Sequence, residues 1–178
     1  QAQWQSLLHE AQSACHQRLD ESLESYLVFL LMRFTDRPEC MARIMAEDYL
    51  QSQSLHGEQR ADKLREVGDH CLLFSGLFPQ QAERRLVHVS YFVNIGRASY
   101  QQLSAGLDRG WASVYRHLSE AFVVLMDILQ AMRGLGGESV LTPIQAMDLW
   151  QETGSRRCFD QMGANGRLSP VAAGHEKH

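Results

Sequence analysis

The stretch ESLESYLVFLLMRF, residues 21–34, is the part of the sequence that decides the fold. Its apolar side chains recur at helical spacing, at positions 23, 26, 27, 30, 31 and 34. Val28, Phe29 and Met32 widen this stripe until little polar surface remains. A helix that is apolar on most sides belongs inside a helical bundle. We therefore expect a central, buried helix at residues 21–34.

Helical spacing of apolar residues continues on both sides of this stretch. The expected helices lie at residues 4–15, 39–49, 58–78, 90–105, 108–132, 143–150 and 155–162, with a short helix and turn in 82–89 and a long polar connection at 51–57. We expect Asp36, Ser90, Asp108 and Thr142 to cap helices. The pattern predicts an all-α fold, a single-domain bundle of about six to eight helices spanning residues 1–162, followed by a loosely held tail at 163–178.

Composition narrows the classes of function. The chain has 178 residues and a formal net charge of -4, so no overall positive charge attracts nucleic acid or an anionic membrane. The longest apolar runs, Tyr26–Met32 and Ala121–Met126, fall far short of the roughly 20 residues that span a bilayer, which predicts no membrane insertion. Four cysteines without a CxxC pair are typical of reduced thiols, and we expect a cytoplasmic location.

The densest group of chemically versatile residues lies in LREVGDHCLLFSGLFP (64–79) and RRLVHVSYFVNIGRASY (84–100). These segments carry the candidate binding residues Asp69, His70, His88, Tyr91, Arg97 and Tyr100, together with glycines at 68, 76 and 96. Arg97 can hold a carboxylate or phosphate, and the glycines would let a ligand or another backbone approach. The structural alternative is an Asp69–Arg97 ion pair between tightly packed helices, and it is favoured because ion pairs are common wherever polar groups meet inside helical bundles.

Known catalytic and metal-binding patterns are missing from the sequence. It contains no ExxH, HExxH or GxSxG motif, and the consecutive His70 and Cys71 point about 100° apart on a helix. The glycines at 134–137 lack the lysine of a phosphate-binding loop. We therefore assign no catalytic residue, no metal site and no cofactor.

Nucleic acid is a weak candidate partner. The pairs Arg84-Arg85 and Arg156-Arg157 are short and have acidic neighbours, and a helix-turn-helix built from the last two helices would carry Asp160 in its recognition segment. A protein partner has milder requirements. Seven methionines and three tryptophans could form an adaptable apolar face, although at helical spacing most of them are expected in the core.

The blocks LREVGDHCLLFSGLFP and YFVNIGRASY, with the later WQETGSRRCF, resemble a family of uncharacterised all-helical proteobacterial proteins. The resemblance covers roughly residues 20–162. It implies a bacterial origin and a shared helical fold, and it supplies no activity, cofactor or catalytic residue to transfer.

Four hypotheses for function follow. The leading one is a non-enzymatic interaction or regulatory protein that binds a protein partner or a small ligand near the helix pair from Gly68 to Arg97. The alternative is an enzyme with Asp69 or His70 as acid or base and Arg97 as an anion anchor. A helical DNA-binding regulator and a homodimer formed through an apolar stripe are further alternatives.

Overall fold

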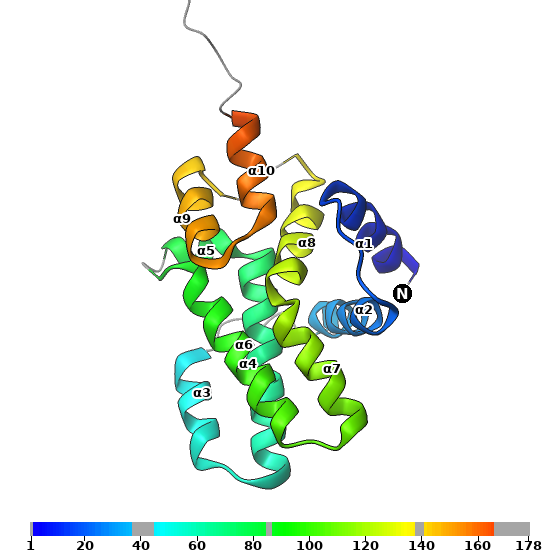
Figure 1. Ribbon diagram of the computed structural model, residues 1–178, viewed down its shortest axis with the longest axis vertical. Coiled ribbons are helices and arrows are strands. Elements are labelled where there is room, and N and C mark those ends of the chain that lie inside the picture. The colour runs from blue at the N-terminus through cyan, green and yellow to red at the C-terminus, as the bar shows by residue number, and fades with distance from the viewer. Residues whose placement is uncertain (1, 37–44, 85–86, 138–140, 166–178) are drawn as a thin grey trace, which may run out of the picture.

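The computed structural model describes residues 2–36, 45–84, 87–137 and 141–165, and these ranges form helices joined by short connections (Figure 1). The ten described helices are α1 (Ala2–Ala14), α2 (Glu21–Asp36), α3 (Met45–Ser54), α4 (Gly57–Leu77), α5 (Pro79–Arg84), α6 (Val89–Ala105), α7 (Arg109–Glu120), α8 (Phe122–Gly134), α9 (Pro143–Thr153) and α10 (Arg156–Asn165). The prediction of an all-α fold is confirmed. The predicted number of helices, six to eight, was too low for the described part of the chain.

One reason for the higher count is a break in the helix predicted at residues 108–132. Ala121 has φ -89° and ψ 7°, outside the α-helical range, and separates α7 from α8. The apolar pattern runs through this point because both helices bury their apolar side chains in one core. Periodicity alone therefore does not reveal the break.

The central helix is α4, which packs against α6, α8 and α3. Figure 1 shows α4 and α6 side by side in the middle of the molecule, with α3 at one end and α9 and α10 at the other. Every residue from Val67 to Gly76 is buried. Such a helix is covered on all sides, which accounts for the apolar run around Cys71.

The expectation that residues 21–34 form the central helix was wrong. Leu23, Leu27 and Leu31 of α2 are buried, but Phe29 is 63% exposed. In Figure 1 α2 lies at the side of the molecule, below α1 and beside α7. Its second apolar face therefore remains on the surface, where it contributes to a cleft.

The glycines of α4 and α6 make room for side chains of neighbouring helices. A Cβ at Gly68 would lie 2.5 Å from Cε1 of Tyr100, and one at Gly76 would lie 2.5 Å from Cβ of Leu129. At Gly96 a Cβ would lie 2.5 Å from ring atoms of Phe122. The structure thus shows close packing at all three positions, with side chains of neighbouring helices in the space beside each glycine.

Several helix ends follow from local sequence, and others do not. Thr142 accepts a hydrogen bond from the backbone N–H of Gln145, whose side chain accepts one from the N–H of Thr142, so the predicted cap is confirmed. Asp108 occupies the expected capping position without a side-chain hydrogen bond. The prediction for Ser90 was wrong, because α6 begins at Val89 and His88 precedes it.

The predicted long connection at residues 51–57 was also wrong. Helix α3 continues to Ser54 and α4 begins at Gly57, so the supposed long connection at 51–57 is mostly helical. Helix α10 extends to Asn165, into the residues predicted as a tail from 163. The rest of that tail, the proposed start of a helix after Asp36, and residues 85–86 of the short helix and turn lie outside the described residues.

Two further expectations concern thiols and membranes. In the described residues Cys15, Cys71 and Cys158 are free thiols, and Cys40 lies outside them. Among the helices of the described ranges, none is long and apolar enough to cross a bilayer.

Candidate functional site

A buried carboxylate on α4 joins three helices. Asp69 Oδ1 accepts a hydrogen bond of 2.6 Å from the hydroxyl of Tyr26 on α2 and one of 2.7 Å from the hydroxyl of Tyr100 on α6. The Asp69 side chain is only 7% exposed. Two of the residues singled out from the sequence, Asp69 and Tyr100, therefore do meet.

Gly68 explains why the Tyr100 hydroxyl reaches this carboxylate. The aromatic ring of Tyr100 lies directly over Gly68, where any larger residue would collide with it. Tyr100 is fully buried, and its ring also packs near Tyr115 and Phe122. The consecutive residues Gly68 and Asp69 thus supply the space and the hydrogen-bond acceptor for one tyrosine.

Burial raises the pKa of Asp69 to about 6, because a carboxylate loses hydration in the interior. Hydrogen bonds from Tyr26 and Tyr100, and the positive charges of Arg33 and Arg65, act in the opposite direction. The pKa values of Tyr26 and Tyr100 are also raised, chiefly by burial and then by the charge of Asp69, so both hydroxyls keep their protons. Near neutral pH the group is a carboxylate held by two hydroxyl donors.

A cleft of about 570 Å³ opens above Asp69 between α2, α4 and α7. Its volume lies within the usual range for small-molecule sites. Each helix contributes residues at helical spacing, which places them on one face. The lining residues are Ser22, Ser25, Tyr26, Phe29 and Arg33 of α2, Arg65 and Asp69 of α4, and Trp111, Val114 and Tyr115 of α7.

Aromatic rings form much of the cleft lining. The Tyr26 and Tyr115 rings meet edge to face with centroids 5.9 Å apart, and the Trp111 ring lies 6.4 Å from that of Tyr115. Trp111 and Phe29 are each 63% exposed, although both side chains are large and apolar. Exposed aromatic residues beside a cleft are typical of a binding surface.

Two arginines supply positive charge to the same cleft. Arg33 Nη1 lies 3.8 Å from Asp69 Oδ2, and its side chain is 50% exposed. Arg65 also lines the cleft; its side chain is 42% exposed, and its Nη2 pairs with Asp62 Oδ1 at 2.7 Å. Both guanidinium groups can therefore contact an occupant of the cleft.

His70 lies on the other side of Asp69, in a smaller cleft of about 80 Å³. That cleft is lined by Leu30, Arg33, Phe34, Glu66, Asp69, His70 and Leu73. Because Arg33 and Asp69 line both clefts, their ion pair separates the two spaces. The small cleft can hold little more than water.

The other three residues singled out from the sequence lie elsewhere. His88, Tyr91 and Arg97 are exposed on or next to α6 and line neither cleft beside Asp69. The predicted ion pair between Asp69 and Arg97 does not form among the described residues, where Arg33 takes that position. The sequence interpretation missed Tyr26, Arg33 and Arg65. The spacing of residues 22, 26, 29 and 33 on one helical face was the available signal.

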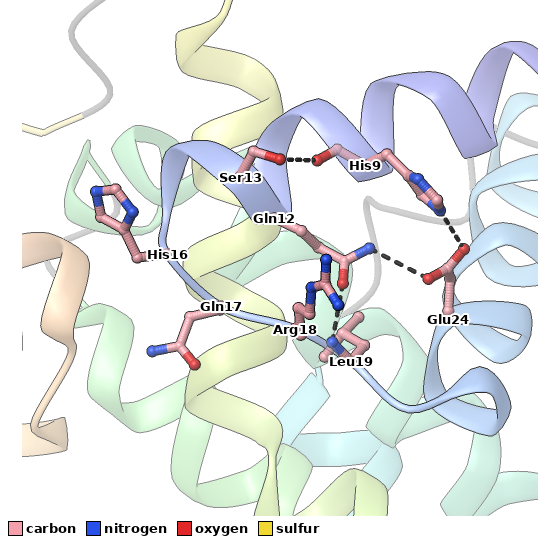
Figure 2. Close-up of a pocket in the computed structure, with 8 residues that line it drawn as sticks. All are labelled: His9, Gln12, Ser13, His16, Gln17, Arg18, Leu19 and Glu24. Carbon is pink, nitrogen blue, oxygen red and sulfur yellow. Dashed lines mark hydrogen bonds and ion pairs between the residues drawn. The ribbon is translucent and has the colours of Figure 1, made fainter.

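A wider cleft, of about 690 Å³, lies where α1 meets α2. Figure 2 shows its centre occupied by Gln12, whose amide donates to Glu24 Oε2 at 3.3 Å and accepts from the backbone N–H of Leu19 at 2.8 Å. Glu24 Oε1 lies 2.9 Å from His9 Nε2. The polar groups at its centre are satisfied by one another, so we interpret this cleft as a structural junction.

The last two helices give little support to DNA binding. Arg157 Nη1 donates to Gln130 Oε1 at 3.3 Å, and the backbone N–H of Arg157 donates to Asp127 Oδ2. Arg157 is thus used to hold α10 against α8. The other predicted basic pair includes Arg85, which lies outside the described residues.

No group of three or more metal-ligating side chains occurs within the ranges that the structure describes. The described cysteines do not resemble reactive thiols, because burial raises the pKa of Cys15 to about 11 and raises that of Cys71 and Cys158 as well.

Comparison with known proteins does not assign the chain to a family. No protein-family model, curated protein or solved structure matches it. The resemblance inferred from residues 64–79 and 91–100 stays a prediction, and the geometry of the cleft is the basis for the function proposed below.

Proposed function

We propose that this protein is a non-enzymatic binding protein whose ligand is a small molecule with an apolar body and an acidic group, held in the α2–α4–α7 cleft. The observation that carries the proposal is the combination of four aromatic side chains and two half-exposed arginines around one cleft of about 570 Å³. Aromatic rings favour an apolar body, and a guanidinium group binds a carboxylate or phosphate in two-pronged geometry.

The proposed site shifts the original hypothesis from the pair α4–α6 to the junction of α4 with α2 and α7. Asp69 stays part of it, while Arg97 is replaced by Arg33 and Arg65. The alternative of an enzyme has less support, because Arg97 is exposed and lines neither cleft beside Asp69 and His70. A regulatory role, a protein partner, a homodimer and a cytoplasmic location stay predictions.

Binding of 8-anilinonaphthalene-1-sulfonate tests the proposal, because this probe carries planar rings and an acidic group. We expect saturable fluorescence enhancement with one probe per chain. Arg33→Gln and Arg65→Gln should each weaken binding about tenfold, as the loss of one charge-assisted contact does. Val114→Trp, which fills the cleft, should abolish binding.

Arg97→Gln is the matched control, since Arg97 is an exposed arginine outside the cleft. It should bind the probe as the unmodified protein does. Equal probe binding by all four variants, with unchanged circular dichroism, would place the probe elsewhere and overturn the proposal.

A further inference from the structure

The two oxygens of Asp69 have different surroundings. Oδ1 accepts both tyrosine hydrogen bonds, whereas Oδ2 lies 3.8 Å from Arg33 Nη1, which is beyond hydrogen-bond distance. Among the described residues, no other hydrogen bond or ion pair joins Oδ2. Each carboxylate oxygen can accept about two hydrogen bonds, and buried carboxylates normally use this capacity. One oxygen of a cleft-lining side chain is therefore available to a donor from a ligand.

The guanidinium group of Arg33 also has unused capacity for contacts. Its guanidinium carries five N–H donors, but its one charge contact in the described part of the chain is the distant one to Asp69. Half of its side chain is exposed, and it lines the cleft. The cleft thus presents a negatively charged carboxylate oxygen of Asp69 and a positively charged guanidinium nitrogen of Arg33, 3.8 Å apart.

This spacing selects among ligand head groups. A simple carboxylic acid at Arg33 brings its negative charge close to Asp69, and a simple amine at Asp69 brings its positive charge close to Arg33. Like charges at such distances repel. A head group that carries an ammonium and a carboxylate on the same carbon satisfies both side chains. In an α-amino acid the amine nitrogen and carboxylate carbon are about 2.5 Å apart, which matches adjacent partners.

The apolar part of the cleft continues from this pair along α2 and α7. Phe29 follows Tyr26 by three residues on α2, and Trp111 and Val114 face them from α7. An apolar or aromatic side chain attached to the head group would lie among these residues and cover the exposed Phe29 and Trp111.

We infer that the ligand of the α2–α4–α7 cleft is a free α-amino acid with an apolar or aromatic side chain, its ammonium group on Asp69 Oδ2 and its carboxylate on Arg33. The inference rests on the proposed function and goes further, because it specifies a zwitterionic ligand. It assigns Asp69 to recognition of the ligand's amine, whereas Tyr26 and Tyr100 hold the Asp69 carboxylate in place.

Calorimetric titration with three related compounds tests the inference. L-phenylalanine carries both charges, 3-phenylpropanoate lacks the amine, and 2-phenylethylamine lacks the carboxylate. We expect L-phenylalanine to bind at least tenfold more tightly than either of the others. A parallel series of L-tryptophan, indole-3-propionate and tryptamine tests a larger side chain. The inference is judged on the series whose amino acid binds more tightly.

Variants assign each charge to its partner. Asp69→Asn should remove the preference for L-phenylalanine over 3-phenylpropanoate while 3-phenylpropanoate still binds. Arg33→Gln should remove the preference over 2-phenylethylamine. Arg97→Gln should change neither preference. The comparison of ligands on the unmodified protein decides the inference even if Asp69→Asn does not fold.

The outcomes separate the inference from the proposed function. If 8-anilinonaphthalene-1-sulfonate and 3-phenylpropanoate bind the cleft but the amino acids bind no more tightly than the acids, the inference is wrong and the proposed function stands. If neither the acids, the amino acids nor the fluorescent probe binds, both are wrong.

Discussion

Asp69 is an acidic residue placed where water hardly reaches it. Its carboxylate is held by two tyrosine hydroxyl groups and faces one distant guanidinium group. Burial of a charge without a close counter-charge costs stability, and the pKa of Asp69, about 6 against an ordinary value of 3.8, reflects this cost. A residue that costs stability in this way is typical of a functional site.

Asp69→Asn makes this cost measurable. The folded state holds the Asp69 proton more tightly than the unfolded state, so ionisation of Asp69 lowers stability as the pH rises from about 4 to about 6. Asparagine has no such proton. We expect the variant to gain up to about 3 kcal/mol relative to the unmodified protein between about pH 4 and pH 7 in urea unfolding experiments.

The comparison at each pH cancels the contribution of other groups, such as Asp127, whose pKa is also raised by burial. A difference in unfolding free energy that stays constant across this pH range would contradict the assignment of the raised pKa to Asp69.

Residue types were easier to predict from sequence than their partners. Asp69 and Tyr100 lie on helices separated by a short connection, so their proximity was predictable, and it is found. Tyr26 and Arg33 precede Asp69 by 43 and 36 residues, and no local pattern states which face of α2 meets α4. Arg97 was misassigned because helical spacing does not distinguish the side of α6 that faces solvent.

Close packing of the helices around α4 and α6 depends on glycines. The ring of Tyr100 occupies the space beside Gly68 that a side chain would otherwise fill, and Phe122 of α8 does the same at Gly96. These contacts let the helices approach closely and bring the Tyr100 hydroxyl to Asp69. Helix packing and the polar group in the site are therefore coupled.

Gly68→Ala should destabilise the protein by about 1–3 kcal/mol, because the added methyl group would lie 2.5 Å from a ring atom of a fully buried tyrosine. Gly110→Ala is the matched control, since nothing lies within 4 Å of a Cβ at this position in α7. It should be neutral or stabilising by up to about 1 kcal/mol. Chemical unfolding curves measure both, and equal effects of the two substitutions would refute the packing argument.

Element boundaries were predictable where a side chain or a special backbone conformation defines them. The Thr142 cap and Gly154, which has a positive φ of 73° at the end of α9, are of this kind. The break at Ala121 has no such marker, since Ala121 is a strong helix former and the apolar pattern continues through it. Tertiary packing, not local preference, ends α7 there.

At the scale of the whole molecule, the core is shared by helices from both ends of the chain. Leu8 of α1, Leu31 of α2, Leu72 of α4, Phe122 of α8 and Leu149 of α9 belong to the same buried cluster. The all-α class followed from the apolar period alone. The placement of α2 at the side did not, because an apolar face reads the same in sequence whether a helix or a ligand covers it.

Phe122→Ala should cost about 3–5 kcal/mol in the free energy of unfolding, because this fully buried side chain contacts Gly96 and lies near Tyr100 at the centre of the core. Phe159→Ala removes the same atoms from a side chain that is 52% exposed, and should cost no more than about 1 kcal/mol. Guanidinium unfolding of both variants gives the comparison. Similar losses would mean that the core does not centre on Phe122.

The exposed indole of Trp111 has an optical consequence. Trp4 and Trp150 are partly buried against the core, whereas Trp111 stands at the cleft in contact with water. Indole emission shifts to shorter wavelength when water is removed from the ring. The protein therefore contains its own spectroscopic reporter: filling of the cleft should shift the fluorescence emission of Trp111 to shorter wavelength without any added label.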